Sequence, residues 1–369
     1  MLSELERHAH ARAVLDPVLK GQVRPSHAYL FHGPGGSGKR AAARAVAAQL
    51  LTEDAADSEG ARLRVLTGAH PDLTWVVPSG AHEILVSDID GPVVAAASRT
   101  PFEATRRVFV IERVDELGDE AANRMLKTLE EPADFVHLIL LTDRPTEVLP
   151  TISSRCQPVR FEAATIDQVA AELREGGVPA DTATALARIA LGQADTARTL
   201  ATADGSALRD AAERFARAAL SGHMWEIRPW QDVLAGARAS GESVREELEQ
   251  RARAEIELYP RRERKRVENE WSERIRRARR RRETASLDLA LQIVALWYGD
   301  LAALAWQAPD LVRHADRLSE LHADEGRDPQ RLIEAMELVE ETRRRFVLNV
   351  SEELAFEALG SRLERILGS

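Results

Sequence analysis

The sequence predicts an α/β domain built on a parallel sheet, followed by two helical domains, and three observations support this prediction. Short apolar runs alternate with helical patterns as far as Phe161, which is typical of strands joined by helices in a parallel sheet. A glycine-rich loop, GPGGSGKR at 33–40, follows the first of these runs. Beyond Phe161 the strand-like runs end, and the rest of the chain has helical periodicity.

The elements can be placed in order along the chain. The predicted strands are 28–33, 73–77, 107–112, 137–142 and 158–162. The predicted helices between these strands are 38–51, 89–98 and 119–130. Pro132 ends the last helix, because proline cannot continue one.

The helical part begins with a recognisable start signal. Thr165 and Gln168 have the spacing of a capping box, in which each side chain satisfies a backbone N–H at the start of a helix. Longer helices follow, among them 243–258 and 353–366. The domains that we predict are an α/β core at 1–163, a small helical domain at 164–205 and an all-helical domain at 206–369.

Composition excludes several classes of protein. The 369 residues have a net charge of −10 and one cysteine, Cys156. One cysteine excludes an intramolecular disulfide and a multi-cysteine zinc site, and the negative charge argues against a protein that coats nucleic acid by itself. The sequence contains no uninterrupted apolar run of the roughly 18 residues that span a bilayer. Its first residues, MLSELERHAH, lack the apolar segment of a signal peptide. We therefore expect a cytoplasmic protein with no membrane contact.

The loop Gly33-x4-Gly38-Lys39 has the spacing of a phosphate-binding loop between a strand and a helix. Glycines allow backbone N–H groups to point at phosphate oxygens, and Lys39 would reach the β and γ phosphates. The next residue is normally a serine or threonine that ligates Mg²⁺, but here it is Arg40. The loop therefore predicts phosphate binding without the usual metal ligand.

The second half of an ATPase site is altered as well. The apolar strand at 108–111 ends in Glu112-Arg113, where an ATPase carries an acidic pair. Glu112 could help to hold a metal, but Arg113 cannot act as a base because its pKa lies far above neutrality. Two interpretations stay open, a vestigial loop and a loop that binds ATP or ADP without hydrolysing it.

Three segments stand in a family order: HAYLFHGPGGSGK at 27–39, DELGDEAANRMLKTLEEP at 115–132 and LILLTDRPTEVLPTISSRC at 138–156. Together they resemble the clamp-loader branch of the AAA+ ATPases, and within it the delta-prime group of the bacterial DNA polymerase III clamp loader. The resemblance covers about 1–205. It implies an AAA+ P-loop core, a helical lid at 164–205 and a collar domain at 206–369.

The resemblance also implies roles for single residues. Arg155, in Ser154-Arg155-Cys156, matches the arginine finger that acts in trans on a neighbouring subunit's ATP. Thr142 matches the sensor-1 position. Thr196 stands where active relatives have a sensor-2 arginine, and Arg198 comes two positions later. Many relatives hold zinc through four cysteines after the loop helix, but 51–66 contains none, so we expect no zinc and no other metal.

The resemblance implies a hydrolysis-deficient stator in a hetero-pentamer. Its partners would be gamma/tau-type ATPase subunits, the delta subunit, the sliding clamp and primer-template DNA, which would be bound without sequence specificity. An autonomous AAA+ ATPase that uses Lys39 and Glu112 is an alternative.

A second alternative is a DNA-binding module at 261–282, the most basic stretch of the chain. The same stretch can also be read as a solvent-exposed face, because Val267, Trp271 and Ile275 recur every four residues and predict one buried stripe. Cys156 has no assignable histidine or acid partner, so we predict a buried apolar thiol rather than a nucleophile.

Overall fold

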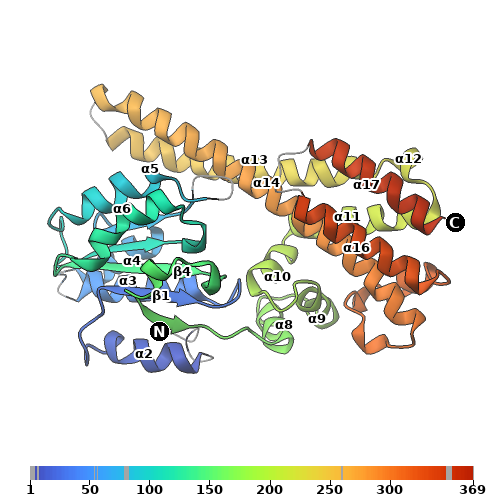
Figure 1. The fold of residues 1–369 in the computed structure, drawn as a ribbon, viewed down its shortest axis with the longest axis horizontal. Coiled ribbons are helices and arrows are strands. Elements are labelled where there is room, and N and C mark those ends of the chain that lie inside the picture. Colours follow the sequence, from blue (N-terminus) through green and yellow to red (C-terminus); the bar gives the residue numbers. More distant parts are fainter. Residues whose placement is uncertain are drawn as a thin grey trace. The chain divides into compact units, whose positions relative to one another are not determined.

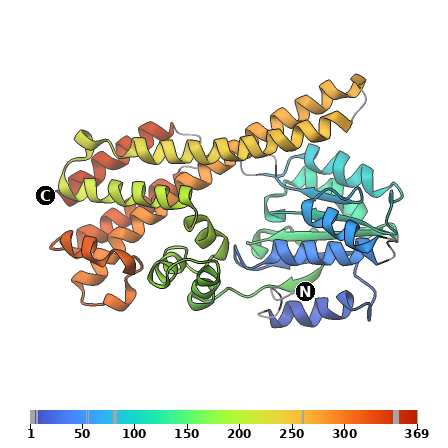
Figure 2. The same cartoon turned by 180° about the vertical axis from the view of Figure 1, so that it is seen from behind.

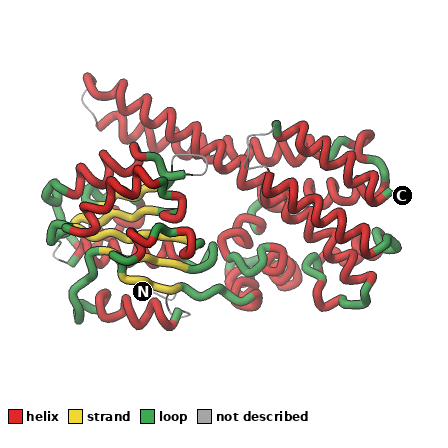
Figure 3. Tube along the Cα trace, viewed as in Figure 1, coloured by secondary structure: helices red, strands yellow, loops and turns green. Residues whose placement is uncertain are grey.

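A computed structural model describes residues 5, 8–53, 55, 57–78, 83–258, 261–345 and 351–368. The chain forms two compact units, Met1–Ala163 and Ala164–Ser369. The first contains the sheet, and the described residues of the second contain helices and loops (Figure 1, Figure 3).

The first unit contains a five-stranded sheet in the order β2-β3-β4-β1-β5. Its strands are β1 (Ala28–His32), β2 (Leu73–Val76), β3 (Arg107–Ile111), β4 (Val136–Thr142) and β5 (Gln157–Arg160). All neighbouring strands are parallel, which confirms the predicted parallel sheet and each predicted strand. Because β1 lies between β4 and β5, the loop after β1 meets the carboxyl ends of β4 and its neighbours.

Helices cover both faces of this sheet. The helices of the first unit are α2 (Ala9–Leu19), α3 (Lys39–Thr52), α4 (Ser58–Thr67), α5 (Val86–Ile89), η1 (Asp90–Ala95), α6 (Asp119–Glu130) and α7 (Pro150–Ser153), with single 3₁₀ turns η2 (Val114–Glu116) and η3 (Pro145–Glu147). One hydrophobic cluster joins α2, α3 and α4 to the sheet, and a second joins α5, η1, α6 and α7 to it. The predicted helices at 38–51 and 119–130 are confirmed.

The helix predicted at 89–98 differs in detail. It begins as α5 and continues as the π-helical turn η1. Pro92 lies inside this turn and has no N–H to offer the carbonyl four residues earlier, so the backbone widens there. Val93 of η1 is nevertheless fully buried.

The described residues of the second unit form helices joined by loops. Its helices are α8 (Ile166–Glu175), α9 (Ala180–Ile189), α10 (Ala194–Leu200), α11 (Ala203–Ser221), α12 (Met224–Ile227), α13 (Trp230–Leu258), α14 (Arg261–Ala305), α15 (Leu318–Ala323), α16 (Pro329–Arg345) and α17 (Glu352–Leu367), with 3₁₀ turns η4 (Pro309–Leu311) and η5 (Ala315–Arg317). The predicted capping box is confirmed: Gln168 N donates to Thr165 Oγ1 over 3.2 Å, and Thr165 N donates to Gln168 Oε1 over 2.9 Å.

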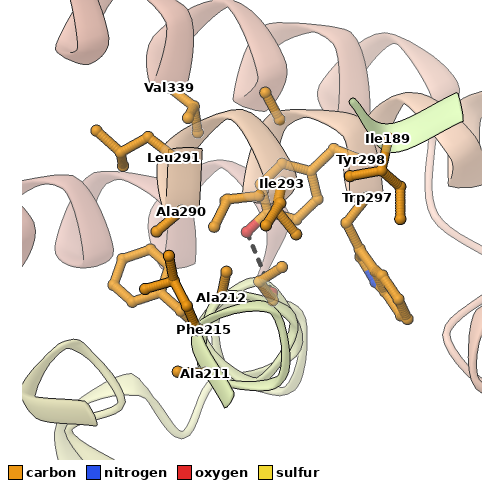
Figure 4. Packing of buried hydrophobic residues seen from close by; sticks show 14 of the residues in the cluster. Ile189, Ala211, Ala212, Phe215, Ala290, Leu291, Ile293, Trp297, Tyr298 and Val339 are labelled. Carbon is orange, nitrogen blue, oxygen red and sulfur yellow. Dashed lines mark hydrogen bonds between the residues drawn. The ribbon is translucent and has the colours of Figure 1, made fainter. Parts of the chain in front are cut away.

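One hydrophobic cluster runs through the second unit, from Val169 in α8 to Leu367 in α17. Figure 4 shows part of it, where Phe215 of α11 lies beside Ala290 of α14. Tyr298 donates its hydroxyl to Ala216 O over 3.1 Å, which satisfies a polar group in this core. Since the cluster includes residues from both predicted helical domains and α11 crosses residue 205, the division into lid and collar stays a prediction.

Helices α13 and α14 form a long hairpin that projects beyond the other helices of their unit in both views (Figure 1, Figure 2). The predicted stripe is confirmed, since Val267 and Trp271 are buried against Ala252 of α13 and Ile275 packs beside them. Arginines around the stripe pair with glutamates, as Arg276 does with Glu273 over 2.6 Å. These pairs match the interpretation of 261–282 as a solvent-exposed face.

Within the described residues, the Arg264–Ala305 part of α14 is the one helix long and apolar enough to cross a membrane by length and composition. However, 67% of its most apolar window is buried inside the structure. The core helix of a soluble protein has the same properties, so this helix is weak evidence for a membrane span.

Candidate functional site

The glycine-rich loop at 33–38 connects β1 to α3 and is folded by three glycines with positive φ. Gly33 has a φ of 149°, Gly36 a φ of 71° and Gly38 a φ of 87°. A Cβ on Gly33 would collide with Phe161 O, so the backbone directly after β5 approaches this position as only glycine allows. Helix α3 begins directly after the loop and directs its free N–H groups toward it. The loop therefore has the local fold that a phosphate-binding site requires.

Lys39 is buried and is satisfied by the protein itself. Its ammonium donates to Gly33 O over 2.6 Å and to Pro34 O over 2.7 Å. It also forms an ion pair with Asp143, with Nζ and Oδ1 2.6 Å apart. An ammonium has three donors, so the partners of Lys39 use its full capacity. A phosphate at this loop would have to compete with the Asp143 carboxylate.

Arg40 is paired with the one carboxylate predicted to remain from the metal site. Its Nε and Nη2 donate to Glu112 Oε2 over 2.9 and 2.5 Å. Trp75 Nε1 donates to the other oxygen, Glu112 Oε1, over 2.7 Å. The side chain of Glu112 is 7% exposed. Both carboxylate oxygens are thus taken up by cationic or neutral donors.

This arrangement does not fit Mg²⁺. In P-loop enzymes the residue after the lysine and the carboxylate of the second strand hold the ion from two sides. Here these two positions, Arg40 and Glu112, hold each other, and a guanidinium cannot ligate a cation. We call the region where the loop at 33–38 meets Arg40 and Glu112 the corner. It keeps the backbone of a phosphate loop, while the side chains at its two metal-binding positions form an ion pair with each other.

Arg113 and Thr142 belong to a polar network beside this corner. Arg113 is in the left-handed region, with a φ of 55°, and its guanidinium pairs with Glu116. Thr142 donates its hydroxyl to Asp115 Oδ1 over 2.6 Å and accepts from Arg144 N over 2.9 Å. Because the Thr142 hydroxyl already donates and accepts a hydrogen bond here, it holds the end of β4 to the turn after β3.

Arg155 lies at the amino end of the strands, opposite the glycine-rich loop at their carboxyl end. It precedes β5, whereas the glycine-rich loop follows β1, and these two strands are adjacent and parallel. Five residues of strand extend over about 16 Å. Arg155 therefore cannot reach the phosphate loop of its own chain.

The side chain of Arg155 is 35% exposed, although Ile152 and Cys156 on either side of it are buried. Ile152 and Cys156 belong to the hydrophobic cluster beneath α6 and α7. The guanidinium donates from Nη1 to Thr151 O over 2.9 Å and pairs through Nη2 with Glu130 Oε1. Burial raises the pKa of the Cys156 thiol to about 12, which makes it a poor nucleophile. The prediction of a buried thiol is confirmed.

Thr196 and Arg198 lie in α10, in the second unit. Thr196 Oγ1 donates to Gln193 Oε1 over 3.4 Å. Arg198 pairs with Asp195 over 2.5 Å and with Glu172 of α8. Their predicted roles stay predictions.

The sequence analysis did not predict four residues that form hydrogen bonds or ion pairs with the predicted site residues. They are Trp75, Asp115, Asp143 and Glu130. One of them had a local signal: Asp143 directly follows the predicted sensor residue Thr142. The others become partners through the order of the strands and the packing of α6, which the sequence pattern does not show.

Comparisons with known proteins find similarity mainly in the first unit. The model of the family described as DNA polymerase III, delta subunit, matches residues 12–165. DNA polymerase III subunit delta' of Pseudomonas aeruginosa is 34% identical over 165 residues, which cover 42% of this chain and 50% of that protein. Subunit delta' of Bacillus subtilis is 38% identical over 143 residues, covering 38% of this chain and 43% of the relative. The chain thus spans about half the length of the curated relatives it matches.

More distant matches have related names. Subunit tau of Bacillus subtilis is 32% identical over 160 residues, which cover 42% of this chain and 28% of tau. A solved structure of a gamma subunit-related protein from Thermotoga maritima aligns with 96% of this chain and 99% of its own, at 13% identity and a TM-score of 0.46.

Proposed function

We propose that the chain is a delta-prime-type clamp-loader subunit that does not hydrolyse ATP, since residues 12–165 match the model of the family described as DNA polymerase III, delta subunit. It would provide Arg155 in trans to the ATP of a neighbouring gamma/tau-type subunit. The delta subunit, the sliding clamp and primer-template DNA would be its further partners, in the cytoplasm.

The observation that carries this proposal is the Arg40–Glu112 ion pair. It removes both metal-binding positions of the chain's own corner, so no Mg²⁺ would organise phosphates there for hydrolysis. ATP or ADP could bind only after Lys39 had left Asp143. Hydrolysis by the isolated chain, which the autonomous ATPase alternative requires, has no support in this geometry.

The position of Arg155 supports the second half of the proposal. Its guanidinium is exposed at the amino end of the strands, and the loop lies at their carboxyl end. There the guanidinium could meet the nucleotide of another subunit. In the best-known arginine-finger systems, such a group accelerates phosphoryl transfer by roughly 10³ to 10⁵ because it stabilises charge in the transition state. The residue can thus contribute to hydrolysis without a complete site on its own chain.

We further propose that 164–205 form the lid and 206–369 the collar through which the subunits assemble. DNA contacts would be made to phosphates and would be independent of sequence. The basic stretch 261–282 does not require a DNA role, because arginines in it pair with glutamates of the hairpin, as Arg276 does with Glu273 and Arg279 with Glu242.

ATP turnover tests the proposal. The chain would be measured alone and mixed with a gamma/tau-type subunit and delta, with clamp and primed DNA present, as wild type and as Arg155→Ala. We expect a silent chain and a mixture that loses activity several-fold or more in the variant. Arg160→Ala, which removes another exposed arginine of the same unit, is the matched control. Turnover by the chain alone, or equal turnover in the two mixtures, would contradict the proposal.

A further inference from the structure

We propose that Glu130 is a positioning residue, which holds the guanidinium of Arg155 in the orientation that a neighbour's nucleotide needs. This inference rests on the proposed function. Glu130 is the last residue of α6, and Arg155 lies in the turn between α7 and β5. Nη2 of Arg155 donates to Glu130 Oε1. The two side chains are 35% and 47% exposed, so an incoming phosphate could reach the pair.

Both partners extend from backbone that the core holds in place. Helix α6 buries Met125 and Leu129, and the turn buries Ile152 and Cys156, in one hydrophobic cluster. The distance between the two backbone positions is therefore set by packing rather than by the ion pair. Because neither backbone segment has to be ordered when the pair forms, the pair can fix the one flexible part, the arginine side chain.

The contacts of the guanidinium leave donors for a second anion. A guanidinium has five N–H donors. Nη1 donates to Thr151 O over 2.9 Å and to Ser154 Oγ over 3.4 Å, and Nη2 donates to Glu130. Among the described residues, the Nε–H and the second Nη2–H have no such partner. Two donors suffice for a bidentate contact with phosphate oxygens, so Glu130 would not have to be displaced.

The expected effect is on the rate rather than on ATP binding. Without Glu130 the arginine side chain would distribute over many rotamers, and only a fraction of these would direct its donors outward. A finger that stabilises charge developing in the transition state contributes to kcat, whereas binding of ground-state ATP depends on the neighbour's own site. Glu130 would also balance the guanidinium charge when a subunit interface excludes water.

The test uses the complete assembly with clamp and primed DNA. Glu130→Ala should lower kcat about two- to fivefold, the range that an exposed ion pair supplies, with the KM for ATP unchanged. Glu130→Gln should retain more activity, because its amide oxygen still accepts a hydrogen bond. Glu131→Ala is the matched control, since it removes the same charge from the same helix end. In an Arg155→Ala background, Glu130→Ala should have no further effect.

Several outcomes would overturn the inference. These are unchanged or higher kcat in Glu130→Ala, an equal loss in Glu131→Ala, or a loss that persists when Arg155 is absent. Thermal melting of each assembled variant shows whether Glu130→Ala merely unfolds, and Glu130→Gln keeps the test decisive in that case. Wild-type kcat in the Arg155→Ala assembly would contradict the proposed function instead, so the two failures can be distinguished.

Discussion

Two arginine–glutamate pairs, Arg40–Glu112 and Arg155–Glu130, lie at opposite ends of the strands of one sheet. They differ in how far the glutamate is buried, and this difference affects whether the arginine is available to another anion. Glu112 is 7% exposed and is held by both Trp75 and Arg40, whereas Glu130 is 47% exposed and lies at a helix end. A buried carboxylate needs its cation permanently, because losing it would leave an unpaired charge away from water. A carboxylate at the surface can share its cation with another anion. On the proposed function, the burial of the acid decides whether the arginine occupies the chain's own site or stays available to a neighbouring subunit.

The largest expected effect is on the alkylation rate of Cys156. Measuring this rate tests whether the core anchors the turn that carries Arg155. A thiol pKa of about 12 lowers the thiolate population at pH 8 on the order of 10³-fold relative to an ordinary cysteine. We expect iodoacetamide to alkylate the native chain correspondingly more slowly than the urea-unfolded chain, as mass spectrometry would measure. Equal rates would show that the turn opens freely.

The next prediction compares Arg155 with Lys39, which lie at opposite ends of the strands. Arg155→Ala should reduce ATP turnover by the assembly several-fold or more, while Lys39→Ala should change it little, since Lys39 is occupied by Asp143. Lys39→Met, which keeps the buried apolar stem, guards against a simple loss of folding. A loss of ATP turnover in both lysine variants would mean that the loop functions in the assembly. The proposed difference between Lys39 and Arg155 would then be wrong.

The Arg40–Glu112 pair, in which the glutamate is buried, should contribute measurably to the free energy of unfolding. Arg40→Ala leaves Glu112 with the hydrogen bond from Trp75. We expect a loss of about 1–2 kcal/mol in the free energy of unfolding, which is less than for a fully buried pair because Arg40 is 61% exposed. Urea unfolding would measure this loss. Combining Arg40→Ala with Glu112→Gln should recover part of it, because the amide is neutral. Additive losses would show that the two side chains are not coupled.

The smallest effect is expected for the exposed pair. A double-mutant cycle with Arg155→Ala and Glu130→Ala should give a coupling of about 0.2–1 kcal/mol in unfolding free energy. The same urea titration provides this value. A coupling as large as that of the buried pair would contradict the idea that the Glu130 carboxylate can share its cation.

Much of the fold could be predicted because local patterns specify it. The strands follow from apolar runs, the start of α8 from a capping box and the loop from its glycine spacing, and each of these signals acts over a few neighbouring residues. The π-helical turn at Pro92 shows where local reading is incomplete. A helical pattern was visible there, but the way in which the backbone accommodates the proline depends on packing.

The sequence by itself determined that a phosphate-type loop is present, that its metal-binding hydroxyl is replaced by Arg40 and that Arg155 stands in a family motif. Only the tertiary structure decided what these residues contact. Arg40 and Glu112 are 72 positions apart, and Arg155 and Glu130 are 25 apart. Such pairs form because the strand order and the packing of α6 bring distant segments together, and no local pattern encodes which carboxylate will be buried beside which arginine.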